Sequence, residues 1–530
     1  MILKFDKVNL SHADKKIFEN LDFVLNSSDK IGIIGENGIG KTSFFNLILK
    51  QIKDNQNKDI IINNTNVGYL PQTQNQTQNN NQKKLKELEQ LMLEDTILAN
   101  PEKYEQILEE YNNLTNQNIS QKEQELITLF KFNKELYQKE KQTHNLSGGE
   151  TTKLNLIKIL AQENDYYLLD EPTNHLDQQT KQILYKYLNN NVKTYIIISH
   201  DVELLNKCTK KIIEIDNSKF KIYHGNYDHY IEEKQKEIQI LLKTKSHNQN
   251  QINKINQNIE NIKQWSAKKL SEMTTHLKHG QATGNFGAGR GSPDSGMRET
   301  KKKVEKMRNK LDALQIPEIK TEEEIKIKYL EFVKPYTNVV KINNLEKNYK
   351  NLNLKIKELT FENNEKIAIQ GKNGSGKSTL LKLITREIKP DNGQITLAEN
   401  LKIGYLSQKI KNKNNKNTLL QELQELKLDL EEHELRKYLG KFLFIKNQCF
   451  KIMKDLSGGE LIRIELLKLI LTGSNYLILD EPTNHLDIKA KDVLATALAD
   501  FPGPILIVSH DDYFLDKFVT RKINLEEYNK

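Results

Sequence analysis

The sequence predicts an α/β protein with two P-loop domains joined by a long α-helical hairpin linker. Four motifs occur in the same order in both halves, at a spacing far beyond the roughly 20–50 residues of a solenoid repeat. Each half also runs from a short apolar strand into a glycine-rich loop and a helical pattern. Apolar residues at three- and four-residue steps fill the segment between the halves. We therefore expect domains at 1–230 and 336–530, with a linker at 231–335.

The repeated motifs begin with a phosphate-binding loop, GENGIGKT in the first half and GKNGSGKS in the second. Glycines let backbone N–H groups close around phosphates at the start of the following helix. We expect Lys41 and Lys377 to contact the β- and γ-phosphates, and the hydroxyls of Thr42 and Ser378 to bind Mg²⁺. A single such loop could be a glycine-rich turn, but two copies that each follow a strand argue against this. The expected nucleotide-binding residues are Gly35, Glu36, Asn37, Gly38, Ile39, Gly40, Lys41, Thr42 and Ser43, and Gly371, Lys372, Asn373, Gly374, Ser375, Gly376, Lys377, Ser378 and Thr379.

An Asp-Glu-Pro-Thr-Asn motif follows an apolar run in each half. Asp170 and Asp480 end those runs and could hold Mg²⁺, directly or through water. The adjacent Glu171 and Glu481 could orient or deprotonate the attacking water. Asp-Glu-Pro alone is more typical of a helix N-cap. Its position downstream of a phosphate loop, in both halves, favours catalysis.

A histidine follows a β-rich run near the end of each half. His200 follows Tyr195–Ile198, and His510 follows Ile505–Val508. A lone histidine is more often structural, but these two are placed to contact a γ-phosphate. The expected catalytic residues are Glu171, Glu481, His200 and His510.

The linker predicts two helices that face each other. The apolar residues with the alternating three- and four-residue spacing are Ile252, Ile255, Ile259 and Ile262, and then Val304, Met307, Leu311 and Leu314. Leu241 continues the phase upstream. A glycine-rich tip near 274–297, with Pro293 in the first turn of the returning helix, separates the two segments. Pro317 is the expected end of the second helix.

Charge is concentrated in the linker. Residues 231–310 hold 17 Lys and Arg against 8 Asp and Glu, which equals the net charge of +9 of the whole chain. A basic stripe of this kind indicates a polyanionic partner, although a solvated helix is the alternative. Only two cysteines are present, which excludes a disulfide framework and zinc or iron–sulfur clusters. No apolar stretch or signal peptide stands out, so we expect a cytoplasmic protein.

Together these motifs resemble the ATP-binding-cassette family, of which LSGGE between a phosphate loop and an Asp-Glu pair is characteristic. Cassettes of that family pair head to tail, so the resemblance implies two composite ATP sites. In the first, Lys41, Asp170, Glu171 and His200 would face Ser457, Gly458 and Gly459. In the second, Lys377, Asp480, Glu481 and His510 would face Ser147, Gly148 and Gly149.

The resemblance assigns further residues to these sites. Gln72 and Gln408 match the family's Q-loops, and Asp177 and Asp487 match its D-loops. Tyr349 matches the adenine-stacking position, where the first half departs from the pattern with His12. The implied Mg²⁺-binding set is Thr42, Gln72, Asp170, Ser378, Gln408 and Asp480.

Two cassettes on one chain with a helical linker resemble the ABC-F group over essentially the whole length. This implies an ATPase that pairs its own cassettes as a monomer and has no membrane partner. It also implies ribosome binding, with the linker near rRNA, P-site tRNA and the peptidyl-transferase centre. A Lys/Arg-rich hairpin suits an rRNA groove. At the tip, Phe286 and Arg290 could stack on bases.

Other classes of ATPase fit the sequence less well. The energy subunit of a membrane transporter would leave the basic linker unexplained. DNA-repair and chromosome-structuring relatives carry their coils or zinc modules inside a cassette, and the recycling relative with iron–sulfur clusters needs more cysteines. The long linker favours antibiotic protection of the ribosome over a housekeeping role in relieving stalled ribosomes, but the sequence leaves both open. It also leaves open whether the two sites are equally active and what the Asn/Gln-rich insertion at 73–82 does.

Overall fold

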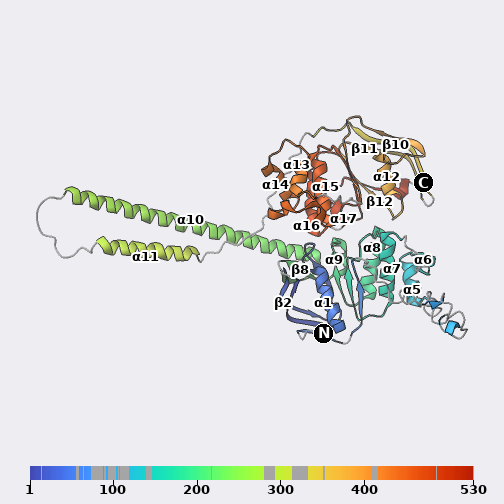
Figure 1. Ribbon diagram of the computed structural model, residues 1–530, viewed down its shortest axis with the longest axis horizontal. Coiled ribbons are helices and arrows are strands. Elements are labelled where there is room, and N and C mark those ends of the chain that lie inside the picture. Colours follow the sequence, from blue (N-terminus) through green and yellow to red (C-terminus); the bar gives the residue numbers. More distant parts are fainter. Residues whose placement is uncertain are drawn as a thin grey trace. The chain divides into compact units, whose positions relative to one another are not determined.

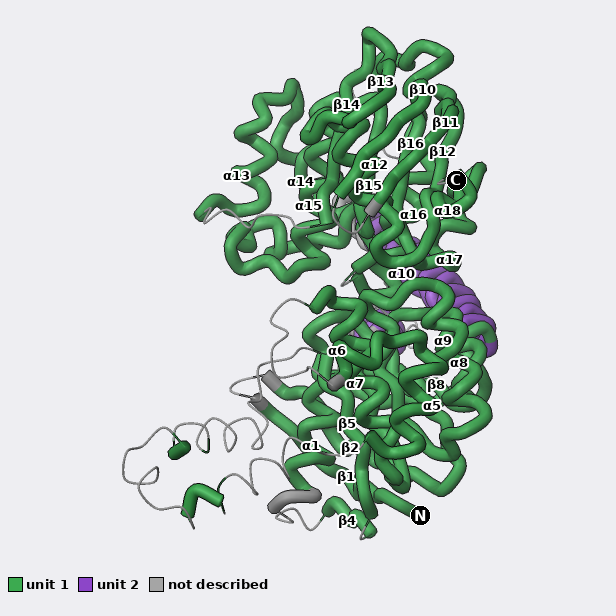
Figure 2. The backbone as a smooth tube through the Cα atoms, turned by 90° about the vertical axis from the view of Figure 1, so that its right-hand side faces the viewer, with its two compact units in different colours: residues 1–228, 325–530 green, residues 229–324 purple. Residues whose placement is uncertain are grey.

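The computed structural model places most of the chain in two compact units. Residues 1–228 and 325–530 form one unit, and residues 229–324 form the other (Figure 2). We call 1–228 the first half and 325–530 the second half. The structure describes residues 1–12, 15–54, 59–63, 65–72, 88, 91–92, 103–105, 107, 119–138, 146–216, 218–279, 293–312, 332–349, 352–408, 416–484 and 486–528.

Some of the segments singled out in the sequence lie outside these residues. They include the Asn/Gln-rich stretch from 73 to 82, most of the glycine-rich tip with Phe286 and Arg290, and Pro317. The side chain of His12 also lies outside the described part.

The first half combines a six-stranded sheet with a three-stranded antiparallel sheet. The larger sheet has the order β5-β6-β7-β3-β8-β9 and is parallel except for the β8–β9 pair, and the smaller has the order β2-β1-β4. The strands are β1 (Leu3–His12), β2 (Lys15–Leu25), β3 (Lys30–Ile34), β4 (Ile60–Ile62), β5 (Val67–Leu70), β6 (Tyr166–Asp170), β7 (Tyr195–Ile198), β8 (Lys211–Asp216) and β9 (Lys219–His224). The helices are α1 (Lys41–Asp54), α5 (Gln121–Leu129), α6 (Lys134–Gln138), α7 (Gly148–Ala161), α8 (Gln178–Asn191) and α9 (Val202–Cys208).

The second half repeats this plan. A parallel sheet of order β14-β15-β16-β12-β17 lies with an antiparallel sheet of order β11-β10-β13. The strands are β10 (Asn338–Tyr349), β11 (Leu352–Glu362), β12 (Lys366–Gln370), β13 (Asn392–Leu397), β14 (Ile403–Leu406), β15 (Tyr476–Asp480), β16 (Ile505–Val508) and β17 (Arg521–Asn524). The helices are α12 (Lys377–Ile384), α13 (Leu419–Gln424), α14 (Glu432–Lys441), η2 (Lys446–Phe450), η3 (Met453–Asp455), α15 (Gly458–Leu471), α16 (Ile488–Asp500), α17 (Asp512–Leu515) and α18 (Leu525–Tyr528).

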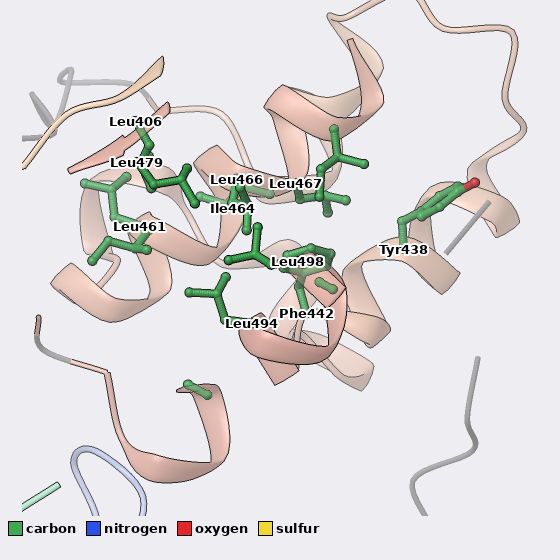
Figure 3. Close-up of a cluster of buried hydrophobic side chains, with 14 of the residues drawn as sticks. Leu406, Tyr438, Phe442, Leu461, Ile464, Leu466, Leu467, Leu479, Leu494 and Leu498 are labelled. Carbon is green, nitrogen blue, oxygen red and sulfur yellow. The ribbon is translucent and has the colours of Figure 1, made fainter. Parts of the chain in front are cut away.

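Each parallel sheet is buried on both faces, and strand alternation divides its side chains between two cores. On β15, Leu477 and Leu479 belong to one core with α15 and α16, whereas Tyr476 and Ile478 belong to the core with α12 and the antiparallel sheet. Figure 3 shows the first of these cores, where Leu479 lies close to side chains of α15. The carboxyl end of β15, with Asp480, is held between the two cores.

The linker contains two helices, as the sequence predicts. Helix α10 (Tyr227–His279) has 53 residues, a length of about 80 Å, and α11 (Pro293–Asp312) begins at the expected proline. The two run antiparallel (Figure 1).

Exposure along the linker follows the predicted seam in part. Ile259 is buried, and Val304 and Met307 are partly buried. Upstream the pattern fails, because Leu241 is 43% exposed. The indole of Trp265 is also largely exposed, at 58%. Within the described residues, no helix is both long and apolar enough to cross a membrane.

Candidate functional site

Both phosphate loops connect a buried parallel strand to a helix. The first runs from β3 to α1, and the second from β12 to α12. Gly38 and Gly374 occupy equivalent positions with φ of 76° and 81°, a left-handed backbone that side chains other than glycine rarely adopt. The loops can therefore turn back toward the start of the helix, where unpaired N–H groups attract anions.

The loop lysines fold over their own loops. Nζ of Lys41 donates to the carbonyl oxygens of Gly35 at 2.6 Å and Glu36 at 3.1 Å. Nζ of Lys377 makes the matching bonds to Gly371 and Lys372, both at 2.8 Å. Each lysine is 8% exposed, and burial lowers its pKa. Each ammonium group therefore lies against the backbone carbonyl oxygens of its own phosphate loop.

A hydroxyl and a carboxylate meet beside each loop. Oγ1 of Thr42 donates to Oδ2 of Asp170 at 2.9 Å. Burial raises the pKa of Asp170 to about 6, against the Thr42 hydrogen bond and the charge of Lys41, which lower it. In the second half, burial likewise raises the pKa of Asp480, and the hydrogen bond from Ser378 opposes that rise.

These groups fit a divalent cation. Oδ1 of Asp480 is buried and has no hydrogen-bond partner among the described residues. Those residues contain no group of three or more His, Cys, Asp or Glu side chains that could hold a metal by itself. Mg²⁺ typically takes one or two carboxylates and completes its shell with phosphate and water oxygens. A single carboxylate and a hydroxyl beside a phosphate loop match that chemistry.

The two glutamates share an unusual backbone. Glu171 and Glu481 have φ of 51° and 50°, strained values for this residue type. Their N–H groups donate to the carbonyl oxygens of Ile198 and Val508, each at 2.8 Å. These bonds hold the strained residues at the carboxyl ends of β6 and β15. Burial raises the pKa of Glu171 to about 7 and also raises that of Glu481. A carboxyl group with such a pKa can exchange a proton near neutral pH.

A histidine lies against each glutamate. Nε2 of His200 is 3.6 Å from Oε1 of Glu171, and His510 and Glu481 repeat this distance. Burial lowers the pKa of His200 well below its usual range and that of His510 to about 3. Both imidazoles are therefore neutral at pH 7, and each could donate one hydrogen bond to a phosphate oxygen.

The two LSGGE segments begin helices. Ser147 and Ser457 are the N-caps of α7 and α15, each in a capping box with the glutamate three residues later. Asp177 and Asp487 are N-caps of α8 and α16. The helix N-termini thus present polar groups at the surface where the halves meet.

Two cavities lie at the predicted sites; the larger combines residues of both halves, and the smaller is lined by residues of the first half alone. The larger, of about 1100 Å³, is lined by Ser147–Gly149 with the second loop, and by Ser457–Gly459 with Asn37 and Gly38 of the first. Both Gln72 and Gln408 also line it. The smaller, of about 300 Å³, is lined by Gly40–Ser43 with Asp170, Glu171 and His200. Hydrogen bonds across the halves support this arrangement: the N–H of Asn37 donates to Asp487 at 3.1 Å, and Asn373 donates to the carbonyl of His175 at 3.0 Å.

We call the Lys41 cluster with Ser457–Gly459 the first site, and the Lys377 cluster with Ser147–Gly149 the second site. Tyr349 lines neither cavity. Its ring is 50% exposed and lies 5.6 Å from Nζ of Lys347. The adenine-stacking assignment thus remains a prediction.

Two functional candidates were missed in the sequence. Lys181 and Lys491 are buried, and each donates across the halves, to the carbonyl oxygens of His510 and His200 respectively. A signal was present, because each stands four residues after the aspartate of NHLD in its half. Because both lysines occur at the same distance from this aspartate, within the first turn of a helix, the repetition could have identified them as candidates.

Comparisons with known proteins agree with the repeated plan. A family described as ABC transporter matches residues 18–174 and 354–484, more than half of the chain, and a second family of the same description matches 213–279. The putative ATP-binding protein YdiF of Bacillus subtilis is 31% identical, covering 100% of this chain and 81% of that protein. The energy-dependent translational throttle protein EttA of Escherichia coli is 29% identical, covering 97% and 90%.

A solved structure gives the same fold. The RNase-L inhibitor superposes with a TM-score of 0.53 at 17% identity, covering 94% of this chain and 84% of that chain. The sequence prediction of the fold class is thus confirmed, because tandem cassettes and a helical linker are both present. The chain is an ATPase that belongs to the ATP-binding-cassette family and, within it, to the ABC-F group of tandem cassettes.

Proposed function

We propose that this ATPase hydrolyses ATP at both composite sites, with one role for each matched pair of residues. Lys41 and Lys377 bind the β- and γ-phosphates, and the signature helix of the opposite half closes on the γ-phosphate. Glu171 and Glu481 accept a proton from the attacking water. The observation that carries this proposal is the same in both halves: a glutamate with a strained backbone and little solvent exposure lies between an aspartate that could bind a metal and a neutral histidine.

The other polar groups of each site hold the reactants in place. Thr42 and Asp170 in the first site, and Ser378 and Asp480 in the second, would bind Mg²⁺ together with Gln72 and Gln408. Mg²⁺, when bound, neutralises charge on the phosphates. The neutral imidazoles of His200 and His510 donate to a γ-phosphate oxygen while leaving the nearby glutamate free to ionise.

The test is the double variant Glu171→Gln with Glu481→Gln. It keeps the size of both side chains but removes their ability to take a proton, so ATP should bind and persist unhydrolysed. Hydrolysis at the parental rate would show that these glutamates are not the bases. Lys186→Met, an exposed change on α8, is the control and should hydrolyse ATP normally.

We also propose that the linker binds the ribosome. Lys301, Lys302 and Lys303 on α11 are all exposed, and the 231–310 segment carries the whole net charge of the chain. EttA is named for a role in translation. The trapped double variant should co-sediment with ribosomes when ATP is present, and increasing salt should release it. Association with membrane vesicles instead would favour the transporter alternative.

Within that role, we propose that the linker reaches toward the tRNA and peptidyl-transferase region and protects the ribosome from antibiotics. The length of α10, about 80 Å, supports a linker that extends far from its first residue. Expression of the protein should raise tolerance to drugs of that region, and deletion of residues 280–292 should abolish the tolerance while ATP hydrolysis continues. Relief of stalled ribosomes without any drug tolerance would assign the housekeeping role.

A further inference from the structure

Two buried lysines cross between the halves. Lys181 lies in the first turn of α8 and Lys491 in the first turn of α16, each one turn after the aspartate that caps its helix. In its own half, each lysine pairs with the aspartate after the catalytic histidine. Nζ of Lys181 is 2.9 Å from Oδ2 of Asp201, and Nζ of Lys491 is 2.6 Å from Oδ2 of Asp511.

Each lysine also reaches the opposite half. Nζ of Lys491 donates to the carbonyl oxygen of His200 at 2.8 Å, and Nζ of Lys181 donates to that of His510 at 3.3 Å. The backbone N–H of His200 in turn donates to Oε2 of Glu171 at 3.3 Å. The histidine residue is therefore held on one side by the glutamate of its own site and on the other by a lysine of the opposite half.

We propose that Lys181 and Lys491 are positioning residues that act in trans, so that each orders the His–Glu pair of the ATP site whose phosphate loop lies in the other half. Lys491 would serve the first site, with Glu171 and His200. Lys181 would serve the second site, with Glu481 and His510. The proposal rests on the catalytic roles proposed above and adds which residue orders the His–Glu pair of each site.

Electrostatics supports the same direction. Burial raises the pKa of Glu171, and the charge of Lys491 lowers it; burial raises the pKa of Glu481, and the charge of Lys181 lowers it. Each lysine thus favours the ionised carboxylate, the form that accepts a proton from water. Although burial alone would lower the pKa of Lys181, the carboxylate of Asp201 raises it, so this lysine remains charged at neutral pH.

A purely structural ion pair would be an inefficient use of two buried ammonium groups. Removing a lysine from water is costly, and an apolar residue of similar size often packs as well. Here each ammonium satisfies an aspartate of its own half and a carbonyl of the other. Each lysine can contact the histidine only when the two halves are together. Closure of the halves would therefore also align the glutamate of that site.

The test measures each site separately, by single-turnover hydrolysis of pre-bound ATP. In the Glu171→Gln background only the second site can hydrolyse, and in the Glu481→Gln background only the first. Lys181→Met should slow ADP formation about tenfold in the Glu171→Gln background and little in the Glu481→Gln background, the order expected for the loss of one hydrogen bond from a charged group. Lys491→Met should show the reverse. Lys186→Met and Lys437→Met, exposed changes in the two halves, are the controls.

Each result has one meaning. Equal slowing of both sites, or slowing of the site in the lysine's own half, would overturn the trans assignment. If either glutamine background still converts two ATP per chain, the proposed bases are wrong, a failure that is visible before any lysine is changed. Lys181→Gln and Lys491→Gln, checked by thermal unfolding, replace the methionine variants if those do not fold.

A conservative variant separates positioning from simple loss of stability. Lys491→Arg keeps a cation that can donate to the carbonyl oxygen of His200, so it should retain much of the first-site rate that Lys491→Met loses. Equal first-site rates for the two variants, both shown to be folded by thermal unfolding, would contradict the proposal.

Discussion

The hydroxyl of Thr42 donates to the buried carboxylate of Asp170 over 2.9 Å, although the two residues lie at the ends of different elements, α1 and β6. The same two side chains are our candidate Mg²⁺ ligands. The hydroxyl oxygen keeps its lone pairs while its hydrogen is donated to Asp170, so this hydrogen bond can orient the oxygen toward the cation.

Thr42→Ala should weaken Mg²⁺ binding at the first site, so that hydrolysis there requires more Mg²⁺. Losing one oxygen that contacts a charged group corresponds to about a tenfold higher Mg²⁺ requirement. Thr42→Ser is the matched control, because the second half has Ser378 at the same position and should function with it. The measurement is a Mg²⁺ titration of single-turnover hydrolysis in the Glu481→Gln background. Equal curves for the alanine and serine variants would remove Thr42 from the ligand set.

Hydrolysis at the first site should increase with pH around neutrality. Burial raises the pKa of Glu171 to about 7, so the protonated, inactive form is populated below that value and the carboxylate above it. The single-turnover rate in the Glu481→Gln background should rise through pH 7 and reach a plateau on the alkaline side. A rate that falls as pH rises over this range would contradict Glu171 as the base.

Gly149→Ala should impair the second site. A Cβ at this position would lie 2.6 Å from the carbonyl oxygen of His175 and 2.7 Å from the amide of Asn373, so the signature helix and the opposite loop could not stay in contact. The matched control is Gly440→Ala on α14, where a Cβ meets nothing within 4 Å and the helix should gain about 0.5–1 kcal/mol. ATP hydrolysis and thermal unfolding measure both. Normal hydrolysis by Gly149→Ala would mean that the contact is not needed.

Charge reversal on α11 should weaken ribosome binding without affecting ATP hydrolysis by the free protein. The variant is Lys301→Glu with Lys302→Glu and Lys303→Glu, all exposed positions. If each lysine meets a phosphate, the slope of log affinity against log salt should fall by roughly two to three units. The control reverses three exposed lysines elsewhere, Lys186, Lys193 and Lys437. An equal loss in the control would show that total charge, rather than the linker, drives binding.

Local chemistry made much of the fold predictable. The runs that become β6 and β15 are continuously apolar and end in an aspartate, which is typical of a central parallel strand followed by a functional loop. Ser147 and Ser457 with a glutamate three residues later are capping boxes that can be recognised without a structure. The repeat then supplied a second test of each motif.

Contacts between the halves could not be predicted in the same way. Lys491 and His200 are far apart in sequence, and a lysine in a helix start ordinarily points to solvent. Only the folded chain shows its ammonium group buried against that carbonyl. Leu241 shows the opposite limit, because its spacing continues the linker seam while its side chain is exposed. Spacing predicts which face a residue occupies, but a partner segment must cover that face before the residue is buried.

The largely exposed indole of Trp265 has a spectroscopic consequence. It is the sole tryptophan of the chain and belongs to α10, so selective excitation of indole reports on the linker and not on either ATP site. The emission of the unlabelled protein is therefore already a linker-specific signal. Docking of α10 into a crowded groove would shift or quench that emission, whereas closure of the two halves alone would leave it nearly constant. A stopped-flow trace of the native chain could then time engagement of the linker separately from the ATP cycle.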